Sequence, residues 1–564
     1  MKTGVTYFLS VALFFMALLL TFSNGFSQEL KESYERSALT VLFTSYGDRY
    51  EREIATALEK EDFVPDQFFS NPVSAGVIDV PQHMATSTQE ERSFFTDYLQ
   101  QKNTGREIVA YWYNHHPGKG FDLSRLFERG EYNATDEEVL VSRASIRGEA
   151  RIRDFGSKLV QNSYVLVIDL TNIGKVEQEK ANDPYGWEAR MGFYLFKLRF
   201  GEQQSASLYD TWIYQDDTDS VRRAKEQLFA GSVYPLEPVL KRGNTITSGK
   251  NYLAAIRVKP SFEELFARLL KNSVENAINF SASQIQAFQV QTKIDGRRPI
   301  SAKIGKKEGL KTDHRYFVYE YVWDEQAQEA VPKRKAVIRA KKVSDNRKKA
   351  TGTTIPSRFY QTYGGTVKEG MTLAARHDVG LSLAGSIVSE GLSGANLRAF
   401  YRTGPFTGIP SFYVVAGMGF DSREYTFTGY NTFEPDNFSF FRYEVGLGKG
   451  IRMFRLLEIM PYATYGRETV TAEDDDYAAF LIKGGLYGGL NLLHNVAVFG
   501  DVNWVAVGNA EIKAGEEFEE TGIAWENLFI DEQGDGRAGG MAIELDEGLT
   551  FESKCYETTS SFLF

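Results

Sequence analysis

The chain has 564 residues, of which 42% are hydrophobic and 25% charged, so it is long enough for three or four domains and apolar enough to bury their cores. Its formal net charge of -11 gives no basis for binding nucleic acid, whose phosphates require a strongly positive surface. The single cysteine, Cys555, excludes a disulfide framework and a cysteine-rich metal site. Glycine and aromatic residues are abundant, as is typical of twisted β-structure and membrane interfaces.

Residues 1–27 have the order of a signal peptide. Lys2 precedes an apolar run over residues 7–22, and small and polar residues follow, so we expect cleavage near Ser27 and Gln28. The alternative is a membrane anchor, for which this run is short. Beyond residue 28 no second run of 18 apolar residues occurs. Any further membrane segment is therefore expected to be β-structure, since only helices and closed barrels satisfy their backbone within lipid.

Residues 28–283 predict a mixed α/β or α+β domain. Helical periodicity predicts helices over 48–60 and 262–278, and the capping-box spacing of Thr135 and Glu138 predicts the start of a helix over 135–161. The apolar run YVLVIDL at residues 164–170 predicts a strand buried on both faces, and further strands are expected at 188–200 and 207–214.

Residues 284–370 predict a small all-β domain with strands at 315–322 and 336–343, separated by glycine-rich turns. Between residues 297 and 349 there are 16 Lys and Arg against seven acids, a balance of +9. A solvated β-surface accounts for this excess. The alternative is contact with an anionic envelope polymer or with lipid headgroups.

From residue 371 the pattern changes to strands with one apolar face and one small or charged face. Seven such segments, and a weaker eighth in which Glu547 interrupts the apolar face, predict an eight-stranded antiparallel barrel over residues 371–553. A tail over residues 554–564 follows it. The charged side chains expected to form a network inside the barrel are Arg398, Arg402, Arg442, Glu444, Lys483 and Asp501.

Alternation alone does not decide which face points inward, because a soluble lipocalin-like barrel alternates too. Three features favour a transmembrane barrel: small residues beside charges on the polar face, short turns alternating with longer loops, and aromatic residues gathered at two levels. One rim is expected to carry Tyr401 and Phe412, and the other Phe420, Phe441, Tyr443, Tyr465 and Trp504.

A barrel of eight strands is filled by its own side chains, so it is expected to anchor rather than conduct. Its longest loop, over residues 508–539, has nine acids against Lys513 and Arg537, a balance of -7. We expect a solvated acidic loop. The alternative is a calcium site at residues 531–536, although the spacing differs from that of an EF-hand.

The number of strands, aromatic rims and loop alternation of residues 371–553 resemble the OmpA-like family of outer-membrane β-barrels. The segments RGEYNAT, RGEARIRDFG and YVLVID between residues 129 and 169, and KIGKKEGL at 303–310, resemble an uncharacterised family of exported proteins from Gram-negative bacteria over about residues 35–372. This second resemblance implies architecture and carries no activity.

Catalytic motifs are absent: the chain has no G-x-S-x-G, P-loop, H-E-x-x-H or C-x-x-C sequence. His115 and His116 are a candidate metal site, but we expect them to lie at the start of a loop. Asp216, Asp217 and Asp219 are a candidate site for a hard cation, but we expect them to form a turn and the start of a helix. Asp219-Ser220-Val221 also resembles the short acceptor motif of bacterial O-glycosylation.

We therefore expect a non-enzymatic outer-membrane protein, without a cofactor, that holds residues 28–370 in the periplasm. Its expected partners are outer-membrane lipid and an envelope polymer or periplasmic protein, with no nucleic acid. Two alternatives stay open. One is a barrel-tethered periplasmic hydrolase with its site within residues 29–280, and the other is a surface adhesin acting through acidic loops.

Overall fold

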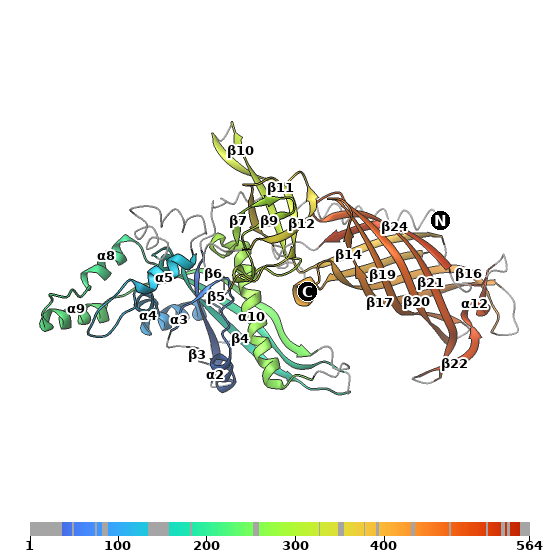
Figure 1. Cartoon of the computed structure of the whole chain (residues 1–564). Helices are drawn as coiled ribbons and strands as arrows, with labels where there is room; N and C mark the ends of the chain where they lie inside the picture. The colour runs from blue at the N-terminus through green and yellow to red at the C-terminus, as the bar shows by residue number, and fades with distance from the viewer. Residues whose placement is uncertain are drawn as a thin grey trace.

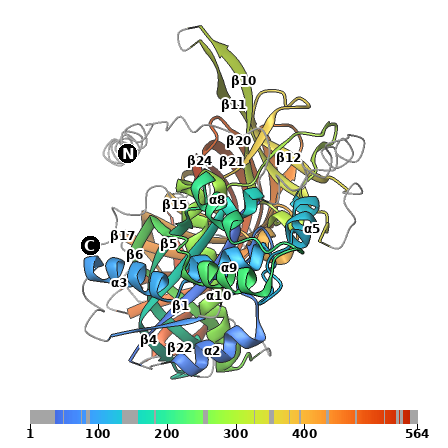
Figure 2. The same ribbon diagram turned by 90° about the vertical axis from the view of Figure 1, so that its left-hand side faces the viewer.

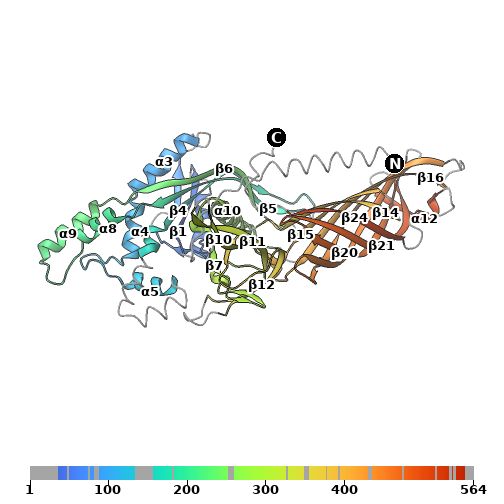
Figure 3. The same cartoon turned by 90° about the horizontal axis from the view of Figure 1, so that it is seen from above.

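The computed structural model describes residues 36–47, 50–73, 76–81, 88–133, 157–180, 183–251, 259–325, 328–347, 355–376, 378–390, 394–429, 435–472, 475–514, 517–531, 536–537 and 542–552. The expected signal peptide, the C-terminal tail and most of the expected helix at 135–161 lie outside these residues. The described chain forms three successive sheets arranged in a row, with the first at one end and the last at the other (Figures 1 and 3).

The first sheet is mixed, with strand order β2-β1-β4-β5-β6 and β3 paired to β1. β1 runs parallel to β2, β3 and β4, whereas β4, β5 and β6 are antiparallel. The expected apolar run at 164–170 lies in β4 and is buried throughout. The strands are β1 Ala38–Tyr46, β2 Phe69–Ser70, β3 Val77–Val80, β4 Ser163–Val176, β5 Tyr185–Leu198 and β6 Leu236–Asn251.

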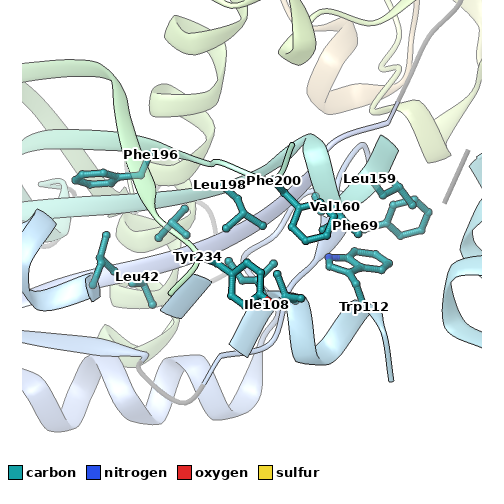
Figure 4. Close-up of a cluster of buried hydrophobic side chains, with 14 of the residues drawn as sticks. Leu42, Phe69, Ile108, Trp112, Leu159, Val160, Phe196, Leu198, Phe200 and Tyr234 are labelled. Atoms are coloured by element: carbon teal, nitrogen blue, oxygen red, sulfur yellow. The ribbon is translucent and has the colours of Figure 1, made fainter. Parts of the chain in front are cut away.

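Helices cover both faces of this sheet, because alternate residues of its central strands point to opposite sides. Leu166 and Ile168 pack with α2 and α10, while Val165 and Val167 pack with α3 and α4. Figure 4 shows the second of these cores, in which Trp112 lies beside Phe69. The helices are α2 Glu51–Lys60, α3 Thr88–Gln101, α4 Thr104–Trp112, α5 Ser124–Asn133, α8 Glu202–Asp210, α9 Asp219–Gly231 and α10 Phe262–Gln284.

In this region one expected helix is confirmed and one expected strand is wrong. The helix expected at 262–278 is present as α10, and it begins after a capping box in which Ser261 and Glu264 bond to each other's backbone N–H. The strand expected at 207–214 is wrong, because α8 covers residues 207–210 and no strand follows at 211–214. Its glutamines, alanine and leucine favour a helix, which buries Leu208 and leaves Tyr209 exposed. None of the described helices is both long and apolar enough to cross a membrane.

The second sheet is antiparallel, with seven strands in the order β7-β13-β10-β11-β12-β9-β8. It encloses its own apolar core and contains both expected strands, in β10 and β11. The hairpin of these two strands projects from the row of sheets (Figures 1 and 2). The strands are β7 Gln291–Lys293, β8 Gly296–Arg297, β9 Ile300–Ala302, β10 Arg315–Asp324, β11 Glu329–Lys342, β12 Ser357–Gly364 and β13 Thr372–Ala375, with short helices η2 Gln286–Phe288 and η3 Lys306–Glu308.

The third sheet contains a closed barrel. Eight of its eleven strands pair antiparallel in sequence, and the pairing of β24 with β14 closes the ring. The expected strand at 543–551 is therefore present as β24, between β21 and β14. The barrel strands are β14 Leu381–Glu390, β15 Gly394–Arg402, β16 Phe412–Phe427, β17 Pro435–Lys449, β19 Leu457–Ala472, β20 Asp475–Asn491, β21 Val496–Ala514 and β24 Ala542–Glu552.

The long segment after β21 is folded rather than a solvated loop. β21 and β22 Glu517–Ala524 form a hairpin, α12 Trp525–Leu528 follows, and β23 Phe529–Ile530 pairs with β16. Trp525 and Phe529 are buried among aromatic residues of β16 and β17. The expectation of a solvated acidic loop at 508–539 is therefore wrong for the described part of this segment. We call residues 517–531 and 536–537 the cap.

Candidate functional site

The outward face of the barrel is apolar. Its large side chains are exposed although they are hydrophobic, with Val445 56%, Ile482 53% and Val502 54% accessible. These residues come from the sequence positions that alternate with the buried ones on β17, β20 and β21. In a soluble barrel the apolar positions would fill the interior, so this arrangement is the reverse of the lipocalin-like alternative.

The inward face is polar and buried. All six residues of the expected charge network lie on this face and are nearly inaccessible, including Arg398, Lys483 and Asp501. Small residues make room for them, since a Cβ on Gly417 would lie 2.8 Å from Oε1 of Glu444. The side chains form three levels along the barrel, which we call the central, lower and upper networks.

The central network joins five strands, β15, β17, β19, β20 and β21. Arg398 pairs with Asp501, and its Nε lies 3.8 Å from Oε1 of Glu444. The hydroxyl of Tyr462 donates to Asp501 at 2.6 Å, and Nζ of Lys483 lies 4.0 Å from Glu444. Two cations therefore face two carboxylates away from water, where pairing is needed to offset the cost of desolvation.

The lower network lies at the end of the barrel that faces the second sheet. Arg402 lies over the ring of Tyr413, whose hydroxyl donates to Glu458 at 2.9 Å. Glu458 also accepts from Nη2 of Arg452 at 2.7 Å. Arg402 thus lies in the lower network rather than beside Arg398, and sequence reasoning did not identify Glu458 or Arg452 as its neighbours.

The upper network involves the cap. Arg537 is fully buried and donates to both oxygens of Glu468, at 2.9 and 3.1 Å, and to Asp421 at 2.6 Å. The indole of Trp525 donates to Glu468 at 2.9 Å, and Arg442 is the cross-strand partner of Glu468. The sequence places Arg537 among the two cations of the acidic segment 508–539. No local pattern indicates its role, since its partners lie on distant strands.

Most of the aromatic residues expected at the rims are exposed on the outer face of the barrel, and the others are half-buried. At the upper level the rings of Phe420 and Phe441 lie 5.0 Å apart, and Tyr465 stacks on Phe480 at 5.6 Å. Tyr443 and Trp504 are exposed at this level too. At the lower level Tyr401 lies near Phe406, while Phe412 is half-buried at the start of β16.

Within the described part of the barrel, three exposed aromatic residues were not among the expected rim residues: Phe406, Phe454 and Phe480. The first two lie in short turns, where the period-two signal that identifies strand faces is absent.

The barrel interior has little free space beside the lower network. A cavity of about 40 Å³ lies there between Arg402, Tyr413 and Tyr487. This volume admits one or two water molecules rather than a solute. Together with the three charged networks, it agrees with the interpretation that a barrel of this size is packed with its own side chains.

Polar contacts join the lower end of the barrel to the second sheet. Asp378, just before β14, accepts from Nη1 of Arg339 at 3.2 Å and lies 3.3 Å from Nε of Arg315. Burial alone would raise the pKa of Asp378, but these two guanidinium groups hold it well below its usual range. Asp313 accepts from the backbone N–H of Ser411 at 2.7 Å.

The first sheet holds one buried carboxylate, Asp169, at the end of the apolar run of β4. It accepts from the hydroxyls of Tyr46 at 2.6 Å and Thr44 at 3.0 Å. Burial raises the pKa of Asp169, against the lowering effects of these two hydroxyls and Lys241. The group is deep in the sheet and satisfied by its neighbours.

The histidine pair does not converge on one point. His115 lies between the rings of Phe121 and Phe229 and 3.2 Å from Glu226, whereas His116 is exposed and lies 3.6 Å from Asp122. Among the described residues, no group of three or more histidine, cysteine or acidic side chains is placed to hold a metal ion.

Of the three aspartates at 216, 217 and 219, Asp217 and Asp219 have local roles in the structure, and Asp216 lies in the turn before α9. Asp217 accepts from the backbone N–H of Tyr214 at 2.8 Å and pairs with Lys225 at 2.7 Å. Asp219 is the first residue of α9, immediately after the capping residue Thr218. The calcium alternative at 531–536 lies mostly outside the described residues.

No family model matches the chain, and no curated protein matches it. Three solved structures of outer-membrane proteins are similar to part of it. They are a major outer membrane protein from Thermus thermophilus (12% identity, 30% of this chain and 97% of that chain, TM-score 0.23), Ail, the attachment invasion locus protein of Yersinia pestis (14%, 30% and 95%, TM-score 0.16), and the outer membrane protease OmpT from Escherichia coli (10%, 43% and 94%, TM-score 0.15). These distant likenesses assign no family, either to the barrel or to the region that precedes it.

Proposed function

We propose that this chain is an outer-membrane protein whose barrel anchors a periplasmic binding or structural module formed by the first two sheets, with no catalytic role. The observation that carries the proposal is the orientation of the closed barrel, which exposes its apolar side chains and buries its charges. Lipid is the solvent in which this orientation is favourable, because exposed apolar side chains lower the free energy only when hydrocarbon surrounds them.

The height of the apolar surface supports this proposal. On β16 the outward-facing residues are apolar from Phe412 to Phe420 and polar above, at Ser422 and Glu424. Nine residues at about 3.3 Å each, tilted by about 40°, span roughly 20–25 Å along the barrel axis. Outer-membrane barrels carry an apolar band of about 25 Å.

The proposed topology follows from the turns. The short connections after β15, β18 (Ile451–Arg452) and β20 all lie at the end that contacts the second sheet. Short turns face the periplasm in bacterial barrels, so the first two sheets are assigned to the periplasm and the cap to the cell surface.

The lipid-facing orientation is tested by a pair of arginine substitutions on one strand. Val445→Arg places a charge within the proposed apolar band, where the cost is about 2–4 kcal/mol, whereas Ser439→Arg lies above the band and is expected to be neutral. Insertion is measured by the heat-dependent change in gel mobility and by the amount of protein in the outer-membrane fraction. Equal insertion of both variants would contradict the proposal, because in water both positions are simply exposed.

The topology is tested with protease. On intact cells, fragments covering residues 36–376 should be protected, and permeabilising the outer membrane should expose them. Cleavage of this region on intact cells would reverse the proposed orientation while leaving the barrel itself in the membrane.

A further inference from the structure

A basic cavity lies where the second sheet meets the barrel. It has a volume of about 350 Å³ and lies between the β8–β9 turn and the turn that joins β18 Ile451–Arg452 to β19. Four arginines line it: Arg297, Arg298, Arg452 and Arg455. None of the described residues that line it is acidic, so the cavity presents a concentrated positive charge.

Arg452 is the most deeply buried of the four. Its side chain is 11% exposed, and its Nη2 donates to Glu458 at 2.7 Å. Its Nε and Nη1 have no hydrogen-bond partner within the described part of the chain. Buried guanidinium N–H groups are costly to leave unbonded, so an anionic oxygen in the cavity would stabilise this arrangement.

The other three arginines are near the opening. Arg297, the last residue of β8, and Arg298, in the tight turn that follows it, are exposed, and Arg455 donates to the hydroxyl of Thr366 at 2.9 Å. Arginines from two separate sheets therefore converge on one space. Several guanidinium groups around a cavity favour phosphate, whose oxygens accept paired N–H donors.

The opening is also apolar on its barrel side. Met453 and Phe454 line the cavity, and Phe454 is 72% exposed at the tip of the turn. Ile451, at the outward edge of β18, is exposed next to them. A ligand that fits both features has a phosphate at one end and a hydrocarbon chain that continues along the outer surface of the barrel.

We infer that this cavity binds the phosphate of an anionic phospholipid in the periplasmic leaflet, with the acyl chains lying against Phe454 and the outer barrel wall. The inference rests on the proposed function, because the proposed topology places the β18–β19 turn at the periplasmic surface of the outer membrane. The phosphate of the bound lipid would join the second sheet to the barrel, because arginines of both line the cavity. It also gives a specific site to part of the basic excess of residues 297–349.

The test uses the purified full chain in a neutral detergent, titrated with phosphatidylglycerol and separately with phosphatidylcholine, with bound lipid counted by native mass spectrometry. Phosphatidylglycerol should bind more tightly. The double substitution Arg297→Gln/Arg298→Gln should weaken its binding about tenfold, as expected for the loss of charge-assisted contacts. The matched control, Lys333→Gln/Lys341→Gln, removes two exposed charges from β11 of the same sheet, outside the cavity, and should change binding less than about twofold.

A second arm separates lipid from soluble phosphate. Phe454→Ser should weaken binding of phosphatidylglycerol and leave competition by inorganic phosphate unchanged. Inorganic phosphate that binds as tightly as phosphatidylglycerol, together with no effect of Phe454→Ser, would overturn the lipid assignment. Equal affinity for the two lipids, or an equal loss in the control pair, would overturn the site itself.

The lipid-binding experiment can reject the inference without rejecting the proposed function. Binding in detergent does not require insertion into a membrane, whereas the Val445→Arg and Ser439→Arg pair measures insertion alone. Loss of selective lipid binding with normal insertion removes only the inference, and loss of the insertion difference removes the proposed function.

Discussion

Arg398 lies inside the barrel out of contact with water, so its charge depends on the carboxylates around it. Asp501 pairs with it directly and Glu444 lies at 3.8 Å. Such a pair adds little stability compared with apolar side chains of the same shape, but removal of one member leaves a buried charge. The central network therefore constrains strands that are not neighbours in the barrel, since Arg398 of β15 meets Asp501 of β21 and Glu444 of β17 across the interior.

The first prediction concerns Asp501→Asn. The substitution leaves the positive charge of Arg398 incompletely balanced and should lower the free energy of unfolding by about 3–5 kcal/mol. Asp436→Asn, at an exposed position of β17, should change it by less than about 0.5 kcal/mol. Urea unfolding in detergent, followed by gel mobility, measures both. Recovery in the double variant Arg398→Met/Asp501→Leu would attribute the loss to charge, and no recovery would attribute it to packing.

The second prediction concerns Asp169. Burial raises the pKa of this carboxyl, so its ionised form is disfavoured in the folded state at neutral pH. Ionised Asp169 therefore destabilises the folded protein at any pH above its pKa in the folded state. This destabilisation disappears as the pH falls from that pKa to 3.8, the ordinary pKa of an aspartate side chain. Asp169→Asn should therefore slow hydrogen exchange in β4 at pH 7 and lose this advantage in acid. Asp79→Asn, exposed on β3, should have no effect, and protection lost at pH 7 in Asp169→Asn would contradict the sign.

At the scale of elements, the cap turns the upper end of the barrel into a second aromatic core. Phe427 and Phe438 extend from β16 and β17 above the apolar band, and Phe529 lies 5.3 Å from both rings. The strands are longer than a membrane requires, with 16 residues in β16 and 19 in β21, and this excess supports the cap.

The third prediction concerns Arg537→Gln. Arg537 joins the cap to β16 and β19, so its loss removes the buried cation that pairs with both Asp421 and Glu468. The cap should open, and proteolysis of cap residues on intact cells should become at least about tenfold faster because the closed state loses several kcal/mol. Lys513→Gln, which removes an exposed pair with Asp476, serves as the control. Unchanged cleavage would mean that aromatic packing alone holds the cap.

At the scale of the whole molecule, the junction between the barrel and the second sheet is polar and buried. Asp378 connects β14 to Arg315 and Arg339 of the second sheet, while Asp313 contacts the turn at Ser411. Such contacts fix the angle between modules more strongly than an apolar surface would, because charge pairs are directional. The orientation of the periplasmic module relative to the membrane is therefore expected to be defined.

The fourth prediction concerns Asp378→Asn. Its pKa is held low by the two arginines, so its contribution is complete above 3.8 and is lost as the pH falls below that value. At pH 7 the substitution should have the same effect as protonation of Asp378 in acid. It should weaken the association of the barrel with the second sheet by about 3 kcal/mol. Spin labels at Lys342→Cys and Ser422→Cys, with Cys555→Ser, should then give a broader distance distribution. Asp345→Asn, in an exposed pair with Arg347, should leave it narrow.

The sequence alone determined which residues of the barrel share a face, because side-chain alternation is a property of the strand itself. Ser382, Arg398 and Asp501 lie inside, and Leu383, Leu397 and Val502 outside, in agreement with the alternation. The buried run of β4 and the helix α10 were equally predictable, since an apolar run and a helical periodicity are local patterns. The strand expected at 207–214 was wrong although the residues of α8 favour a helix, so here the apparent alternation was misleading and helix propensity was the better guide.

Tertiary structure alone decided the contacts between distant parts of the chain. Arg537 bonds to partners 69 and 116 positions away, so its burial cannot be read from the acidic segment around it. The arginine-lined cavity likewise requires Arg297 and Arg455 to meet across two sheets. The physical reason is that alternation and capping depend on neighbouring residues, whereas charge pairing and cavities depend on which strands the closed barrel brings together.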